Sequence, residues 1–222
     1  MLLYYISDRS QFPGSEAERR EKLLANIAGA IRCGVDYIQL REKDLCAREL
    51  EDLTRRTMQL RAENGQLGTA VSGLGTTELA KTRVLVNSRT DSAIAAGADG
   101  VHLRSGDLAP ADVRAVASRA GVERVIIAVS CHRLAEVRAA ADGGADFVVF
   151  GPVFGKNERD GTRLEELHES AQIGIPVLAL GGVTVQNAAS CMAAGAAGIA
   201  GIRLFQSDFL PKTVPCLRSL RA

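Results

Sequence analysis

The sequence predicts an α/β fold in which eight parallel strands, each followed by a helix, close into a barrel. The first observation behind this prediction is a repeated phrase, in which a glycine stands between an alanine-rich helical pattern and a short apolar run. The phrase occurs at residues 34–40, 97–103, 144–150 and, in a weaker form, 195–201. A glycine can take the positive φ that ends a helix, and an apolar run this short suits a buried strand. The phrase therefore predicts a helix-to-strand joint.

The second observation is a regular alternation of strand-like and helical patterns along the whole chain. The predicted strands cover residues 2–7, 35–42, 83–87, 99–104, 124–130, 146–151, 175–181 and 198–203. The predicted helices follow them one for one, at residues 16–33, 47–63, 90–96, 110–119, 133–142, 163–172, 184–194 and 207–220. Eight such units close most economically as a TIM (β/α)8 barrel, which gathers its functional groups at the carboxyl ends of the strands. An open doubly wound sheet is the alternative, which the even repeat disfavours.

The strands are predicted to be parallel and the chain to form one domain. Strands buried on both faces are continuous apolar runs, as residues 124–130 are. The 222 residues are a usual length for an α/β barrel, and no linker divides residues 1–222. Only residues 64–81 fit badly, because connections in such folds are usually a few residues long. We expect an inserted flexible loop there, with an oligomer contact as the alternative.

Charge and hydropathy exclude several classes of partner. Lys plus Arg number 27 and Asp plus Glu number 26, so the sequence offers no basic field for nucleic acid and no polybasic membrane patch. The first residues carry no basic leader, and no apolar run approaches the roughly 18 residues of a membrane span. We therefore expect a cytoplasmic protein whose ligands are small molecules; a homo-oligomer is left open.

Cationic and amide side chains follow the second predicted strand. Gln39, Arg41 and Lys43 alternate there, so a period of two would place all three on one side, in the barrel mouth. Two cations and an amide suit a phosphate or pyrophosphate. The alternative is that Arg41 and Lys43 pair with Glu42, with Asp44 or with an acid lining the barrel. Asn87 ends the third predicted strand at the same rim.

The fourth and fifth predicted strands end in further titratable groups. His102 should point inward, either as a satisfied core group or as a ligand contact. Asp107 is either a Mg²⁺ ligand or a residue that starts the next helix. His132 follows Ser130, and its pKa range suits proton transfer near neutrality, although it too stands where a helix starts.

Glycine-rich segments end the seventh and eighth predicted strands. Residues 179–184 include Gly182, and residues 198–203 include Gly201. Backbone N–H groups at these two loops, together with a helix N-terminus, form the recurring phosphate site of this barrel.

The chain resembles a known family, thiamine phosphate synthase and its thiazole tautomerase relatives. The motifs that carry the resemblance keep their order and lie at predicted strand ends: residues 5–8, 39–43, 86–89, 97–103, 129–132, 144–147, 151–154 and 175–182. The resemblance implies a barrel in which the synthase joins a pyrimidine methyl diphosphate to a thiazole phosphate. Pyrophosphate leaves through a carbocation-like step, with Mg²⁺ and basic groups stabilising the departing charge.

The resemblance also assigns roles to residues of this chain. The pyrophosphate side is implied for Gln39, Arg41, Lys43 and Asn87. It implies that Asp107 is one Mg²⁺ ligand, that Ser130 contacts the pyrimidine and that Gly182 belongs to the thiazole phosphate site. We add to the substrate site His102, Lys156 and Gly201. Arg41 and Lys43 are the candidate catalytic groups of a synthase, and His132 that of a tautomerase.

Three departures from the synthase pattern bear on which reaction is expected. Ser88 stands where the synthase has its second metal-binding Asp, residues 104–105 replace Gly-Gln, and residues 155–161 replace a Thr-rich segment ending in Lys. A tautomerase needs no magnesium pyrophosphate, since a histidine suffices for its proton transfer. The sequence thus slightly favours a tautomerase-like role without cofactor. A Mg²⁺-dependent synthase and a noncatalytic binder of thiazole phosphate are the alternatives.

Overall fold

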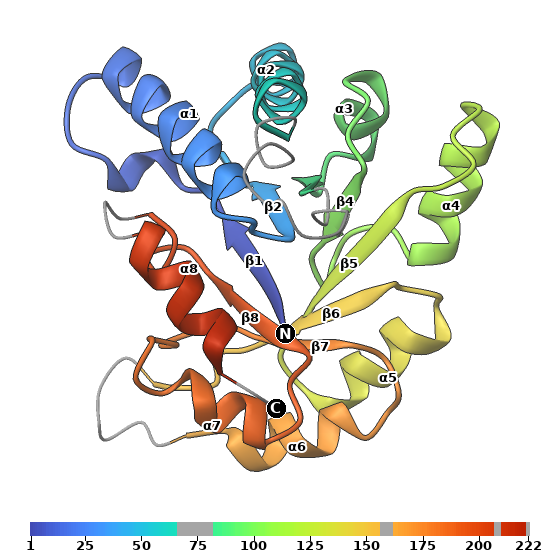
Figure 1. Cartoon of the computed structure of the whole chain (residues 1–222). Helices are drawn as coiled ribbons and strands as arrows, with labels where there is room; N and C mark the ends of the chain where they lie inside the picture. The colour runs from blue at the N-terminus through green and yellow to red at the C-terminus, as the bar shows by residue number, and fades with distance from the viewer. Residues whose placement is uncertain (66–81, 156–161, 207–209, 221–222) are drawn as a thin grey trace, which may run out of the picture.

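The computed structural model describes residues 1–65, 82–155, 162–206 and 210–220, and within them it forms one closed barrel (Figure 1). The strands run in chain order around the barrel, β8 closes onto β1, and every neighbouring pair is parallel. The TIM-barrel prediction is therefore confirmed. From residue 66 on, the predicted insertion lies outside the described residues, as does Lys156; residues 64 and 65 end a helix.

In the described part of the chain the strands are β1 (Leu2–Ile6), β2 (Tyr37–Leu40), β3 (Arg83–Asn87), β4 (Gly100–Leu103), β5 (Ile126–Cys131), β6 (Phe147–Phe150), β7 (Val177–Ala179) and β8 (Gly198–Gly201). The helices are η1 (Arg9–Gln11, a 3-10 turn), α1 (Glu16–Arg32), α2 (Ala47–Gly65), α3 (Thr90–Ala95), α4 (Pro110–Arg119), α5 (Leu134–Asp142), α6 (Leu164–Ala171), α7 (Ala188–Ala193) and α8 (Leu210–Ser219). Figure 1 shows the helices surrounding the strands. No helix among these residues is long and apolar enough to cross a membrane.

Several element ends differ from the prediction. Helix α7 begins at Ala188, four residues after the predicted start, because Asn187 holds the preceding segment in a turn. Strand β2 ends at Leu40, two residues before the predicted end. Strand β7 keeps only Val177–Ala179 of the predicted run.

Alternation along the strands creates two separate apolar layers. Tyr4 and Ile6 point into the barrel, where they join a cluster that includes Phe147 and Leu178. Leu3 and most other outward-facing strand residues pack against the helices in a larger cluster, and Val101, Leu103 and Ile127 do so in a smaller one. This is the packing expected when a parallel sheet is buried on both faces. The barrel interior is therefore filled below its mouth.

The repeated phrase forms the predicted joints. Its glycines have φ values of 79°, 68°, 80° and 93° at Gly34, Gly97, Gly144 and Gly195. In three of the four copies an aspartate follows two residues later, and its carboxylate accepts the backbone N–H of the second residue of the preceding strand. The pairs are Asp36 with Leu3 (2.6 Å), Asp99 with Val84 (2.8 Å) and Asp146 with Ile127 (2.7 Å). Each aspartate of the repeated phrase thus links its own strand to the preceding one at the amino-terminal end of the barrel.

Candidate active site

The barrel mouth collects polar side chains from neighbouring strands. By the same alternation that places Tyr4 and Ile6 inside, the inward positions near the carboxyl ends are those of Gln39, Asn87, His102 and Ser130. Asn87 is paired with His102 in the register of β3 and β4. These four predicted site residues therefore lie around one opening.

Gln39 presents a buried group without a partner. Its side chain is almost fully buried, and no acceptor among the described residues lies within hydrogen-bond distance of its amide nitrogen. A buried donor left unsatisfied costs on the order of 1–3 kcal/mol. A ligand that brings an acceptor to the barrel mouth would remove this cost.

His102 links two hydroxyl groups across the barrel interior. Its Nδ1 lies 3.0 Å from the Tyr4 hydroxyl, and its Nε2 lies 2.7 Å from the Ser130 hydroxyl. Burial, followed by the charge of Arg41, lowers the pKa of His102 to about 3. The ring is therefore neutral near pH 7, with one nitrogen donating and the other accepting.

The buried hydroxyl of Tyr4 selects the tautomer of His102. Burial, with a contribution from Tyr37, raises the pKa of Tyr4, so this hydroxyl keeps its proton. Among the described residues its hydrogen-bond partner is His102 Nδ1, and a buried O–H must donate. Nδ1 then accepts, and Nε2–H donates to Ser130. The Ser130 hydroxyl consequently keeps its own proton to offer to a ligand.

Arg41 and Lys43 are available for an anion. Arg41 contributes, after burial, to the low pKa of His102, so its charge lies near the mouth. Lys43 lies exposed in a turn, because β2 has already ended; strand alternation therefore does not orient it as predicted. Within the described ranges neither cation forms an ion pair. Glu42 and Asp44, the partners of the alternative interpretation, bind Arg9 instead.

Asp107 faces Ser88 and Arg104 beside the mouth. Its carboxylate accepts the Arg104 backbone N–H at 2.7 Å and the guanidinium at 3.1 Å. Burial would raise the pKa of Asp107, but the hydrogen bonds from Arg104 and from the Ser88 hydroxyl outweigh burial and lower it. Helix α4 is preceded by Ala109 as its N-cap, so Asp107 does not start that helix.

The side chains around Asp107 limit which metal ion could bind there. No group of three His, Cys, Asp or Glu side chains with metal-binding geometry occurs among the described residues. The set fits Mg²⁺ only with help from a ligand, since Mg²⁺ is often held by one carboxylate, substrate phosphates and water. Ser88 has a φ of 62°, a backbone conformation that side chains other than Asn and Asp rarely adopt.

His132 follows β5 at the rim. Its Nδ1 lies 2.5 Å from the carbonyl oxygen of Gly151. A carbonyl can only accept, so Nδ1 carries a proton, and Nε2 of the neutral ring is an acceptor. The residue is exposed and its backbone N–H donates to Glu136 at 2.6 Å, while Arg133 is the N-cap of α5. His132 therefore belongs to the loop, and no hydrogen-bond partner of its Nε2 occurs among the described residues.

Two loops supply backbone donors at the ends of β7 and β8. Asn187 clasps the first loop, donating to the Gly182 carbonyl at 3.0 Å and accepting from Thr184 N–H at 2.8 Å. Within the described residues no acceptor is paired with the Gly182 N–H. The second loop turns after Gly201, where Phe205 N–H bonds to the Ile202 carbonyl. The phosphate site at these two loops stays a prediction, with the Gly182 N–H as a candidate donor, and six-residue α7 starts too late to supply a helix N-terminus.

A glycine at 182 is also required by packing. Its φ is +65°, and a Cβ there would lie 2.7 Å from the Cβ of Phe154. This contact explains the glycine without a ligand, so the residue type alone does not identify a phosphate site.

Sequence reasoning missed Tyr4, Arg9 and Asn187, which hold other site residues in place. The signal for Arg9 was present, because the segment after β1 is polar like the segments after β2 and β4. Tyr4 carried no such signal, since an aromatic residue in an apolar strand is usual for a core.

Comparison with protein families gives a match over most of the chain. A family model described as thiamine monophosphate synthase matches residues 3–205. A putative thiamine-phosphate synthase of Geobacter sulfurreducens is 38% identical over 215 residues, covering 95% of this chain and 89% of that protein. A thiamine-phosphate synthase of Roseiflexus sp. (strain RS-1) is 33% identical over 206 residues, covering 90% and 76%.

Solved structures agree with these sequence matches. Thiamine phosphate pyrophosphorylase from Pyrococcus furiosus superposes with a TM-score of 0.76 at 27% identity, covering 99% of this chain and 94% of that one. A 3-hexulose-6-phosphate synthase gives a TM-score of 0.66 at 17% identity, which shows a shared fold alone.

Proposed function

Since this chain belongs to the thiamine monophosphate synthase family, we propose that it joins a pyrimidine methyl diphosphate to a thiazole phosphate and releases pyrophosphate. The relatives described above carry the synthase name. Their names favour this reaction over the tautomerase-like role that the departures at Ser88 and residues 104–105 favoured. The proposed reaction makes the chain a transferase of thiamine biosynthesis.

One observation carries the proposal: the mouth holds positive charge and donors without protein acceptors. Arg41 and Lys43 form no ion pair among the described residues, and the buried Gln39 amide has no partner. When the bond between the pyrimidine methylene carbon and the diphosphate oxygen breaks, negative charge grows on the leaving pyrophosphate. Fixed cations and donors at that point stabilise the transition state more than the ground state.

The remaining polar groups would hold the two organic rings. The Ser130 hydroxyl, kept as a donor by His102, would bind a ring nitrogen of the pyrimidine. The N–H groups beside Gly182 and Gly201 would bind the phosphate of the thiazole. Asn87 would add a further donor on the pyrophosphate side. These assignments place the reacting carbon between the cations and the second phosphate.

A Mg²⁺ ion would be held by Asp107, with the Ser88 oxygen and pyrophosphate oxygens completing its ligands. Bound there, the ion would neutralise part of the charge on the leaving group. The lowered pKa of Asp107 keeps its carboxylate ionised for such a role.

The proposal is tested by incubating the purified protein with hydroxymethylpyrimidine diphosphate, thiazole phosphate and Mg²⁺, and measuring thiamine phosphate. We expect turnover, and a loss of roughly 10²-fold or more in Arg41→Ala, because the charge on pyrophosphate then lacks its partner. Absence of thiamine phosphate from a folded, metal-supplied protein would reject the synthase role.

A tautomerase-like proton transfer is the second candidate, since the described contacts leave Nε2 of His132 open as a base. Its test is His132→Asn, which keeps a polar group but cannot titrate. A tautomerase should lose roughly 10² to 10⁴ in rate, whereas a synthase should lose little. A third candidate, a noncatalytic binder, predicts saturable thiazole phosphate binding with neither reaction.

A further inference from the structure

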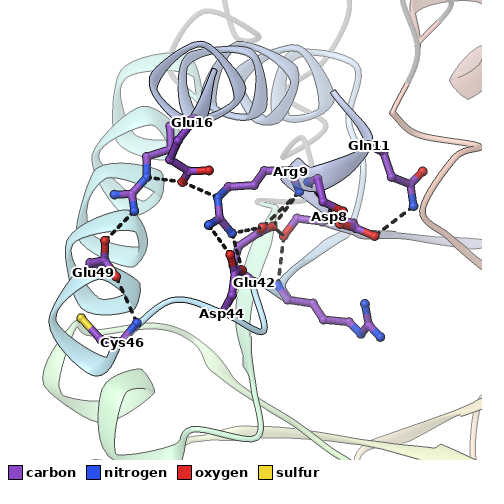
Figure 2. A network of polar contacts seen from close by, with 12 residues as sticks. Asp8, Arg9, Gln11, Glu16, Glu42, Asp44, Cys46 and Glu49 are labelled. Atoms are coloured by element: carbon purple, nitrogen blue, oxygen red, sulfur yellow. Dashed lines mark hydrogen bonds and ion pairs between the residues drawn. The ribbon is translucent and has the colours of Figure 1, made fainter. Parts of the chain in front are cut away.

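The loop after β2 alternates cations and carboxylates, yet the two kinds of charge are kept apart. Arg41, Glu42, Lys43 and Asp44 follow one another directly. Opposite charges this close in sequence could neutralise each other and leave nothing for an anion. Figure 2 shows that the carboxylates are bound by Arg9, which comes from the turn η1 after β1.

Arg9 donates hydrogen bonds to both carboxylates. Its Nη1 lies 3.0 Å from Glu42, and its two terminal nitrogens each lie 2.8 Å from the Asp44 oxygens. Its backbone N–H donates to Glu42 at 3.0 Å, and its Nε donates to Glu16 at 2.7 Å. Four guanidinium hydrogen bonds of Arg9 therefore go to the carboxylates of Glu16, Glu42 and Asp44.

Ser7 connects this ion-pair network to the backbone of the site. Its hydroxyl donates to Glu42 at 2.5 Å and accepts the backbone N–H of Arg41 at 3.0 Å. The position of the Arg41 backbone is thus fixed by the same carboxylate that Arg9 holds.

Burial shows which of the two carboxylates depends more on Arg9. The Glu42 side chain is 1% exposed and that of Arg9 is 6% exposed, whereas the Asp44 side chain is 74% exposed. Water screens Asp44, but a buried carboxylate such as Glu42 must have a cation or give up its charge. Arg9 is that cation, which removes the need for Glu42 to recruit a neighbour.

We propose that Arg9 is a positioning residue, which binds Glu42 so that Arg41 and Lys43 remain free for the anionic ligand. Without Arg9, the buried Glu42 would attract the nearest cations, and these flank it in sequence. The effect on the ligand would then come through Glu42, and not through a lost contact with Arg9. The proposal rests on the proposed function only in taking pyrophosphate as the anion of the mouth.

A double-mutant cycle tests this prediction. Pyrophosphate affinity is measured by calorimetry for the wild-type protein, Arg9→Met, Glu42→Gln and the combined variant, with circular dichroism to check the fold. We expect Arg9→Met to weaken binding by about tenfold, and Glu42→Gln in that background to restore most of the affinity. The restoration is the deciding result, because a purely structural role for Arg9 would make the second change neutral or worse.

Arg20→Met is the matched control. Arg20 also binds Glu16, at 2.8 Å, and it binds Glu49 at 2.6 Å, but within the described residues it forms no hydrogen bond or ion pair with Glu42 or Asp44. Its removal should leave pyrophosphate affinity within about twofold of the wild-type value. An equal loss in Arg20→Met and Arg9→Met would overturn the proposal, as would unchanged affinity in Arg9→Met.

Two further outcomes are separable. If Arg9→Met does not fold, Glu42→Gln alone decides: unchanged or tighter pyrophosphate binding supports the proposal, and a tenfold loss overturns it. Wild-type protein that binds pyrophosphate but forms no thiamine phosphate would reject the synthase role while leaving the positioning role to the cycle. Wild-type protein that does not bind pyrophosphate would overturn the positioning proposal itself.

Discussion

His102 illustrates how one buried side chain can set the direction of the hydrogen bonds that another makes. Tyr4 donates to Nδ1, so Nε2–H donates to Ser130, and the serine proton remains for a ligand. We expect nitrogen NMR of the free protein at pH 7 to find the proton of the His102 ring on Nε2. In Tyr4→Phe the donor to Nδ1 is lost, so the Nδ1–H tautomer should appear alongside the first. A wild-type ring protonated on Nδ1 would contradict this assignment.

The same histidine should make folding stability depend on pH. Its pKa is about 3 in the folded protein and 6.5 in the unfolded chain, so the unfolded state binds more protons between these values. The stability due to neutral His102 is complete above pH 6.5 and falls as pH drops toward 3. Urea unfolding between pH 6 and 4 should show a slope steeper by up to about 1.4 kcal/mol per pH unit than in His102→Gln. Parallel slopes would show that His102 does not bind fewer protons when folded.

Ser88 offers a test of the magnesium site. Its φ of 62° suits Asp better than Ser, and its hydroxyl contributes to the low pKa of Asp107. Ser88→Asp should therefore tighten Mg²⁺ binding by about tenfold in the presence of pyrophosphate, because a second carboxylate strengthens a hard-cation site. Calorimetry on both proteins measures this. Equal, tight affinities would show that Asp107 and the ligand oxygens already suffice.

Residue positions were predicted where a side chain lies at the end of a strand and missed where it supports another residue. Gln39, Asn87 and Ser130 lie at the mouth, as their places at strand ends predicted, and their roles there stay predictions. Arg9 was missed because its role depends on Glu42, a residue 33 positions away. The orientation of Lys43 failed for a local reason: the strand ended before it, so a period of two no longer applied.

At the scale of elements, the aspartates of the repeated phrase join neighbouring strands at the amino-terminal end of the barrel. Asp99 accepts the Val84 N–H and binds both Arg61 and Arg83, and its side chain is 12% exposed. Asp146 makes the matching bond to Ile127, but its side chain is 42% exposed. We expect Asp99→Ala to lower the free energy of unfolding by about 3 kcal/mol and Asp146→Ala by about 1 kcal/mol, measured by urea denaturation. The reverse order would contradict the role given to burial.

The elements also show which boundaries the sequence pattern predicts and which it does not. The four joints were predicted because a glycine and an apolar run are local signals, and the positive φ at each glycine confirms them. The start of α7 was not predicted, because the side chain of Asn187 accepts the Thr184 N–H and donates to the Gly182 carbonyl, which makes a turn of residues whose pattern predicts a helix. A competing side-chain hydrogen bond of this kind carries no periodicity.

At the scale of the whole molecule, the proposed function predicts two anion sites on different strands. The pyrophosphate side would use Gln39 in β2 and Arg41 just after it, whereas the second phosphate would use the loops after β7 and β8. The two sites share no residue, so each ligand should stabilise the fold independently. A ligand at 100 times its dissociation constant contributes about 2.7 kcal/mol.

This independence gives a prediction for thermal unfolding. For a chain of 222 residues, such a contribution corresponds to a rise in Tm of about 5–10 °C. We expect pyrophosphate and thiazole phosphate each to raise Tm when added alone. Arg41→Ala should abolish the rise caused by pyrophosphate and keep the rise caused by thiazole phosphate, because only the first ligand needs that guanidinium. Loss of both rises in Arg41→Ala would mean that a single site binds either anion, and the carboxyl ends of β7 and β8 would then have no part in phosphate binding.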